Sequence, residues 1–229
     1  MGRTAIQKIM ARASGKDVQV GDRVWCRIDL STARDFGGPN CVLQFEEVMG
    51  TEGKVWDPNK IAFTFDLQAP AHSEKVSNNQ KIIRQFAKRQ GIPKVFDVNW
   101  GIGQHVLLEN GLVKPGDVIL GTDSHMNLLG AVGAFATGVG NTDIVASWIQ
   151  GTLWFRVPET MKVTATGKFQ RGVYMRDLLT HLVGTLGADG MFFKAVEFVG
   201  DAIERSSLAE RITLCSMVTE MSGKVGLIM

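Results

Sequence analysis

The sequence predicts an α/β protein in which helices cover a largely parallel β-sheet. Segments with the alternating pattern of strands are separated along the chain by segments with helical periodicity. Residues 117–121, DVILG, are nearly all apolar, which is typical of a parallel strand buried on both faces. No repeat, low-complexity tract or linker breaks this order, so we expect residues 1–229 to form one compact domain.

The first third of the chain contains one expected helix and two expected strands. Residues 4–13 place their apolar side chains on one face of a helix that Gly15 should end. Residues 20–30, VGDRVWCRIDL, predict a strand that is entered through a Gly-Asp turn. Residues 60–66, KIAFTFD, are rich in β-forming side chains and predict a second strand.

The middle of the chain continues the alternation. Ser73 is suited to cap a helix that Gly91 ends, and strands are expected at residues 94–98 and 117–121. The glycines between residues 130 and 140 suggest a helix that packs closely on the sheet.

The last third predicts a helix after residue 143, a strand at 161–169 and a helix at 175–186. The sequence Ser207-Leu-Ala-Glu210 matches a capping box, in which side chains at the start of a helix bond its free amide groups. We therefore expect a final helix that begins there and runs to about residue 221.

Composition limits the classes of function. The formal net charge is only +2, so no polyanionic partner such as a nucleic acid is indicated. No apolar run is long enough to span a bilayer and no secretory leader is recognisable, so we expect a cytoplasmic protein. Cys26, Cys41 and Cys215 are scattered and form no CxxC pair, so we expect buried apolar side chains and no metal ligands in this chain.

Polar residues follow three of the expected strands. Asp66 follows the first, the segment NWGIGQH at residues 99–105 follows the second, and residues 122–125, TDSH, follow the third. In open α/β sheets, ligands bind beyond the carboxyl ends of the strands. If the strands are neighbours, two carboxylates, two imidazoles and a serine converge at one edge of the sheet.

Other interpretations of these residues are less favoured. A Ser-His-Asp triad needs three side chains that converge in space, adjacent residues seldom do so, and the sequence has no GxSxG elbow. Asp123 by itself could be only a helix cap. His72 and His181 have no polar company and are expected at the surface. The glycine run lacks the GxGxxG pattern of a dinucleotide site.

Five segments carry a family resemblance that runs in order along the whole chain. They are MGRTAIQKIMARASGKDVQVGD, KVFDVNWGIGQHVLLENGLVKPGD, GTDSHMNLLGAVGAFATGVGNTD, GTLWFRVPETMKV and SLAERITLCSMVTEMSGKVGLI. The chain resembles the N-terminal part of the aconitase superfamily, with its closest likeness to the large subunits of 3-isopropylmalate dehydratase and homoaconitase. The resemblance implies a three-layer α/β/α aconitase-like domain over residues 1–229.

The same resemblance implies a reaction, a cofactor and a partner. Members of the family dehydrate and rehydrate a hydroxy-dicarboxylate or tricarboxylate, and a 4Fe-4S cluster acts as the Lewis acid on the leaving hydroxyl. A small swivelling-domain subunit is the expected partner, and leucine biosynthesis is the expected pathway. The cysteines that bind the family's cluster lie in later segments, so we expect the cluster ligands outside this chain.

The resemblance also assigns roles to residues. Carried over position by position, the catalytic group is Asp123, Ser124, His125, Asp66, His105 and Glu220. The expected substrate-binding group is Arg34, Asp35, Gln104 and Ser216, with Ser216 one helical turn before Glu220. We expect Arg34 to pair with a substrate carboxylate, although a surface arginine is an equally good interpretation. Asp66 is expected to orient a neighbouring donor, for which His105 is the candidate.

This sequence departs from the family pattern at several of these positions. Leu67 replaces the histidine that follows Asp66 in the family, and Gln104 replaces the histidine of the next loop, with His105 one position later. Ser216 and Met126 replace an asparagine and a threonine.

Three functions therefore stay open. The chain is part of a hydro-lyase, or a separately encoded subunit, or a non-catalytic relative that binds a small carboxylate or a partner chain. The first is favoured, and the isolated 229 residues are expected to be inactive without the cluster. The apolar residues at the end of the sequence, VGLIM, weigh for this interpretation.

Overall fold

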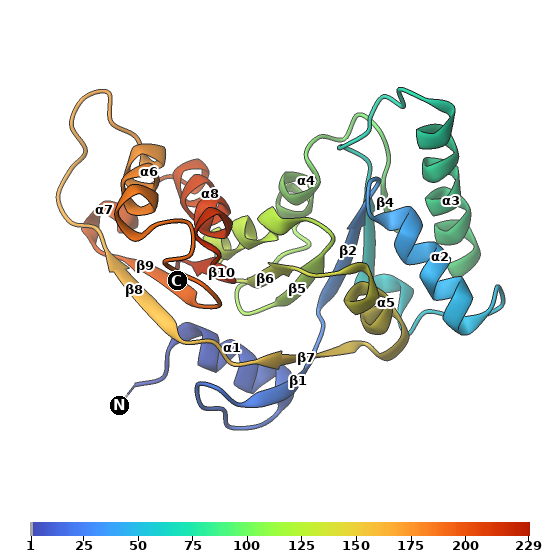
Figure 1. Cartoon of the computed structure of the whole chain (residues 1–229), viewed down its shortest axis with the longest axis horizontal. Coiled ribbons are helices and arrows are strands. Elements are labelled where there is room, and N and C mark those ends of the chain that lie inside the picture. The colour runs from blue at the N-terminus through green and yellow to red at the C-terminus, as the bar shows by residue number, and fades with distance from the viewer. Residues whose placement is uncertain (1) are drawn as a thin grey trace.

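The computed structural model describes residues 2–229, which form three β-sheets with helices around them (Figure 1). The largest is a five-stranded parallel sheet in the order β4-β3-β2-β5-β6. Its strands are β2 (Leu30–Arg34), β3 (Ile61–Thr64), β4 (Lys94–Phe96), β5 (Val118–Gly121) and β6 (Phe135–Gly138). The prediction of an α/β protein with a largely parallel sheet is confirmed.

Helices cover both faces of the five-stranded sheet. Those near the sheet are α2 (Gly38–Met49), α3 (Glu74–Gln90), α4 (Gly103–Glu109), α5 (Asn141–Gln150) and the 3₁₀ segment η2 (Ser124–Val132). Along β3, Phe63 packs on Phe86 of α3 and Trp148 of α5. The next residue back, Ala62, belongs to the cluster on the other face, together with Leu107 of α4. This alternation produces three layers.

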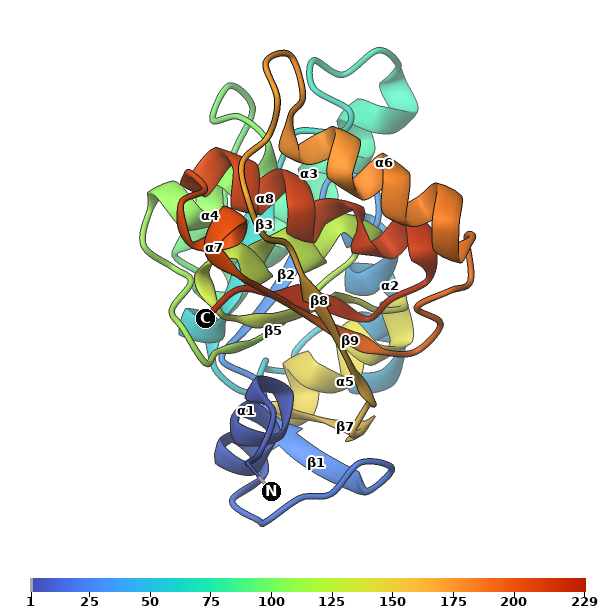
Figure 2. The same cartoon turned by 90° about the vertical axis from the view of Figure 1, so that its left-hand side faces the viewer.

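A second unit contains the three-stranded parallel sheet β10-β9-β8. Its elements are β8 (Thr160–Thr164), α6 (Met175–Leu186), β9 (Ala195–Val199), α7 (Asp201–Glu204), α8 (Leu208–Ser216), the 3₁₀ segment η3 (Met217–Met221) and β10 (Val225–Leu227). Figure 2 views this side of the molecule, with α6 and α8 above β8 and β9. Leu179, Phe198 and Leu214 are buried in its own core.

An antiparallel ribbon lies along the lower edge in Figure 1. It pairs β1 (Arg23–Arg27) with β7 (Thr152–Arg156), and α1 (Ala5–Ser14) packs beside it. The short 3₁₀ segment η1 (Pro58–Lys60) precedes β3. None of the helices described within residues 2–229 has both the length and the apolar character that crossing a bilayer requires.

The 3₁₀ segment η2 meets β10 of the three-stranded sheet where two glycines let the backbone come close. A Cβ atom on Gly130 would lie 1.6 Å from the carbonyl oxygen of Gly226, so no side chain fits there. The amide of Ile228 also donates a hydrogen bond to the carbonyl of Gly130, at 3.0 Å. This contact fixes η2, which carries the TDSH loop, against β10 of the second unit.

Several predicted elements are confirmed. Thr4 and Gly15 cap α1, Ser73 caps α3, residues 175–186 form α6, and Ser207 with Glu210 forms the capping box of α8.

Several predictions were wrong. The final helix ends at Ser216 and not near residue 221, and the strand expected at 161–169 ends at Thr164. The segment from 124 to 140 is not one helix, because Gly133 ends η2 with φ +77° and residues 135–138 add strand β6 beside β5. Residues 20–30 are not one strand, because β1 pairs with β7 while the chain reaches β2 of the main sheet only at Leu30. The elements α2, α4, α7, β7, β9 and β10 were not predicted.

Candidate active site

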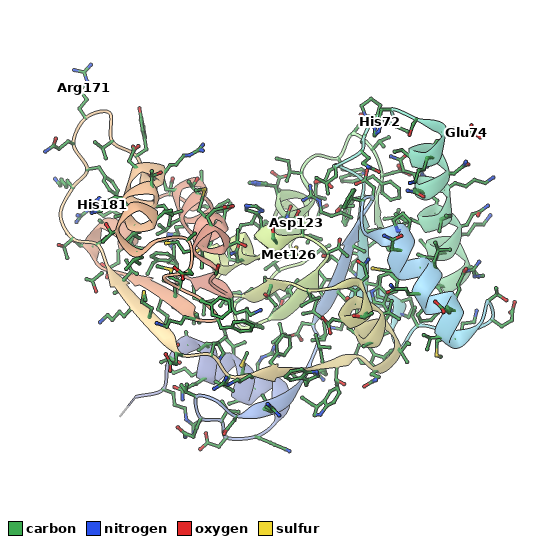
Figure 3. The ribbon with its side chains drawn as sticks, viewed as in Figure 1. His72, Glu74, Asp123, Met126, Arg171 and His181 are labelled. Carbon is green, nitrogen blue, oxygen red and sulfur yellow. The ribbon has the colours of Figure 1, made fainter. Side chains whose placement is uncertain are left out.

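The site lies at the carboxyl ends of three neighbouring strands. Arg34 ends β2, Asp66 follows β3, and Asp123 follows β5. Because β2 pairs with both β3 and β5, the central residue of the three is Arg34. Figure 3 shows Asp123 near the centre of the molecule, between the helices of the two larger sheets. His72 and His181 are exposed and lie apart from it, as predicted.

Arg34 joins the two carboxylates. Its Nε donates to Oδ1 of Asp66 at 2.9 Å and one terminal nitrogen donates to Oδ2 of Asp66, while the other donates to Oδ2 of Asp123 at 2.5 Å. The three side chains are only 10%, 5% and 16% exposed. Three of the five guanidinium N–H donors are thus engaged by the two carboxylates, so Arg34 is not a surface group and its charge is paired inside the protein.

The remaining acceptor capacity of the two carboxylates holds two loops. Oδ1 of Asp123 accepts the side-chain amide of Gln104 and the backbone amide of His125, both at 2.8 Å. Oδ2 of Asp66 accepts the backbone amide of Gly103 at 2.6 Å. The donors to Asp66 are thus Arg34 and Gly103, and His105 is not among them.

Asp35 holds the loop that follows β3. It is fully buried, and its two carboxylate oxygens accept the backbone amides of Leu67 at 3.0 Å and Gln68 at 2.9 Å. Both oxygens are therefore engaged with the loop after β3, and the geometry makes Asp35 a residue that positions this loop.

A more exposed row of polar side chains begins at the TDSH loop, residues 122–125. The hydroxyl of Ser124 lies 3.2 Å from Nδ1 of His125, and Nε2 of His125 lies 3.1 Å from Oε1 of Glu220. The side chains of His125 and Glu220 are 41% and 49% exposed. Glu220 belongs to η3, so this pair joins the two larger units. Ser124 and His125 do face each other, contrary to our expectation for adjacent residues.

Two other predicted residues lie less directly in this arrangement. His105 is half-buried in the first turn of α4, and no hydrogen bond of its ring occurs within residues 2–229. Ser216 ends α8, and Glu220 lies in the 3₁₀ turn that follows, so the expected α-helical spacing between them is lost.

Two residues that position the site were missed. The hydroxyl of Thr122 accepts the backbone amide of Arg34 at 3.1 Å and so ties β2 to the TDSH loop. A Cβ on Gly103 would lie 2.4 Å from Oγ1 of Thr64, so only glycine allows the approach of α4 to Asp66. The place of Thr122 inside the polar TDSH motif could have indicated its role. Nothing in the sequence around Gly103 indicates that a side chain would not fit there.

The described residues do not fit a 4Fe-4S cluster. Cys26, Cys41 and Cys215 lie in β1, α2 and α8 and are all buried. Burial raises the pKa of Cys26 to about 11 and that of Cys41 to about 12, and it raises the pKa of Cys215 as well. Among residues 2–229, no three His, Cys, Asp or Glu side chains are grouped so as to hold a metal ion.

The charge of the site restricts what it can bind unaided. Arg34 brings one positive charge, whereas Asp66, Asp123 and Glu220 bring three carboxylates. A dicarboxylate needs cationic donors that face it, and the charge of Arg34 is already shared between Asp66 and Asp123. Any further positive charge for such a ligand has to come from other residues.

Comparison with known proteins places the chain among relatives of one kind. A model of the aconitase family (aconitate hydratase) matches residues 7–229. The 3-isopropylmalate dehydratase large subunit 1 of Methanopyrus kandleri is 46% identical over 228 residues, which is 100% of this chain and 54% of that protein. The probable methanogen homoaconitase large subunit of Methanothermobacter thermautotrophicus is 40% identical, over 96% of this chain and 52% of its own length.

A solved structure shares the fold. Aconitase X of Thermococcus kodakaraensis, in its holo-form, has a TM-score of 0.54 and 12% identity, and the likeness covers 98% of this chain and 57% of that one. At this identity the likeness supports the fold alone. The chain spans about half the length of the curated relatives it matches.

Proposed function

Because the chain belongs to the aconitase family, we propose that it is the N-terminal part of a hydro-lyase. The proposed reaction is the dehydration and rehydration of a hydroxy-dicarboxylate such as 3-isopropylmalate, the substrate in the name of its relatives. The supporting observation is the His125–Glu220 pair, which is exposed but anchored on Asp123, whose side chain is only 16% exposed. Residues 1–229 would be one aconitase-like domain of a larger cytoplasmic enzyme.

Elimination of water needs one group that gives a proton to the leaving hydroxyl and one that takes a proton from the neighbouring carbon. His125 is suited to the first role because its ring is accessible, and Glu220 is suited to the second. The Glu220 carboxylate would take the proton from carbon and pass it, across 3.1 Å, to Nε2 of His125 after the ring has given its own proton to the leaving hydroxyl. Ser124 is exposed and holds Nδ1, so it orients the ring and contacts ligand from the same loop. Asp123 fixes the backbone of His125.

The buried residues have a supporting role in this proposal. Arg34, Asp66 and Gln104 hold Asp123, and Asp35 holds the loop that carries Leu67. Leucine cannot give or take a proton. The proton donor at the carboxyl ends of the strands must therefore be a residue other than Leu67. We propose that His105, beside Gln104 in α4, and Ser216, four residues before Glu220, contact the substrate.

The cofactor and the partner belong to the proposal as well. An iron–sulfur cluster would need thiolates supplied by polypeptide outside residues 1–229, since the three cysteines here do not fit it. The relatives are called large subunits, so we propose a small-subunit partner. The cationic donors that the anionic site lacks would come from the same added polypeptide.

The test is to isolate the complete assembly anaerobically from its source cells and supply 3-isopropylmalate in deuterated water. We expect formation of the conjugated alkene, seen by ultraviolet absorbance, and deuterium in the recovered substrate. Glu220→Gln should slow both signals together. An assembly that contains its cluster yet forms no alkene from 3-isopropylmalate or other substituted malates would contradict the proposal.

A further inference from the structure

A second cavity lies away from the polar site. It has a volume of about 600 Å³ and opens between the β1–β7 ribbon, the edge strand β6 and the turn that carries Phe192 and Phe193. In the shared view of Figures 1 and 3, β7 runs along the lower part of the molecule, whereas Asp123 lies above the sheet. Cavities of this size suit small organic ligands.

Two arginines at the rim of this cavity stand directly opposite each other. Arg23 and Arg156 are paired across the antiparallel β1–β7 ribbon, and both are exposed. Like charges at such a position repel each other. Within residues 2–229 neither forms an ion pair within 4.0 Å. An anion between them would remove the repulsion and satisfy both guanidinium groups.

A third cation lies deeper in the cavity. Lys224 is half-buried, with its ammonium 4.3 Å from the ring centre of Phe193, and it too has no ion pair within 4.0 Å in the described chain. Burial lowers the pKa of Lys224, and the charge of Asp143 opposes that change. Asp143 is the one acidic side chain in the lining, so three cations face one carboxylate.

The walls are aromatic. Phe135 and Phe155 meet edge to face with ring centres 5.3 Å apart, while Trp154 and Phe192 are 52% and 62% exposed. Phe193 adopts φ 58°, a left-handed conformation that a bulky residue rarely takes without a constraint. Exposed rings with no covering side chains leave apolar surface that a flat ligand can bury.

We propose that this cavity is a binding site for a small organic anion with a flat apolar body. The aromatic walls take the body of the ligand, and Arg23, Arg156 and Lys224 face its carboxylate, sulfonate or phosphate group. The volume favours a small molecule over a polypeptide. The site is independent of the hydro-lyase chemistry, because none of its residues belongs to the Asp123 network.

The test uses the complete isolated protein and two dyes with the same aromatic body. Anilinonaphthalene sulfonate carries a negative charge, and phenylnaphthylamine carries none. Fluorescence titration should give one saturable site for the sulfonate and at least threefold weaker binding of the neutral dye. Arg156→Ser and Lys224→Met should each weaken sulfonate binding by roughly threefold, and Arg23→Ser/Arg156→Ser together by about tenfold.

Arg27→Ser is the matched control, since Arg27 lies on the same ribbon but does not line the cavity. It should leave sulfonate binding unchanged, and Phe192→Ala should weaken both dyes, with circular dichroism showing that each variant is folded. Equal binding of the two dyes, or no loss in the arginine and lysine variants, would overturn the proposal. Displacement of the bound dye by oligoglutamate would also overturn the proposal, because the cavity would then bind a polypeptide.

Discussion

Two sets of polar residues meet at the TDSH loop, residues 122–125, but they differ in burial. Arg34, Asp66 and Asp123 form a network whose side chains are at most 16% exposed. His125 and Glu220 form a pair whose side chains are at least 41% exposed. The buried set has its hydrogen bonds satisfied inside the protein, and the exposed set can still meet a ligand. We therefore assign the buried set to positioning the loop and propose that the exposed pair takes part in the chemistry.

The largest expected effect comes from removing the cation of the buried network. Arg34→Met leaves Asp66 and Asp123 without their partner, and it should lower the free energy of unfolding by about 3–5 kcal/mol. Arg84→Met is the control, because the Arg84–Asp97 pair is 39% exposed on both sides and should change stability by less than about 1 kcal/mol. Urea unfolding at pH 7 measures both. Equal losses would show that burial does not separate the two pairs.

A smaller loss is expected where α4 meets the network. Gly103→Ala would place a methyl group 2.4 Å from Oγ1 of Thr64 and push the Gly103 amide away from Asp66, so we expect a loss of about 1–3 kcal/mol. Gly184→Ala is the matched control, because Gly184 lies in α6 with open space around it. That change should raise stability by about 0.5–1 kcal/mol. Opposite shifts in melting temperature are the predicted result.

The exposed pair should contribute little to stability. Glu220→Gln removes a carboxylate that is half exposed, so the free energy of unfolding should change by less than about 0.5 kcal/mol. The same urea titration gives this value. A loss as large as that of Arg34→Met would mean that the His125–Glu220 contact holds the two units together and is not available for chemistry.

The cysteines should show no reaction in the folded chain. Burial raises the pKa of Cys26 to about 11 and that of Cys41 to about 12, so at pH 8 almost all of both thiols are protonated. We expect no alkylation by iodoacetamide in the native protein and three alkylated sites in denaturant, read by intact-mass spectrometry. Rapid native labelling would show accessible thiolates and reopen the question of metal ligands.

Much of the fold was predictable from local signals, because capping residues act within one turn of a helix. Ser73 and Ser207 marked two helix starts correctly. The strand β6 was missed because a glycine-rich apolar segment resembles a helix, and its pairing with β5 is a long-range contact. The strand ends and the family resemblance named the residues that the structure brings together around Asp123, but the contacts of Arg34 with the two carboxylates were not predicted. Whether an arginine faces a substrate or two buried carboxylates depends on which strands become neighbours.

The decisive experiment is the turnover of 3-isopropylmalate by the complete, anaerobically isolated assembly that carries His125→Asn. We expect a folded protein whose kcat falls by roughly 10²–10⁴, since His125 gives the proton to the leaving hydroxyl. Arg205→Met removes one member of the exposed Arg205–Asp201 pair at the end of α7 and should leave kcat unchanged. Unchanged turnover in the His125→Asn assembly would contradict the division between a buried frame and an exposed reactive pair.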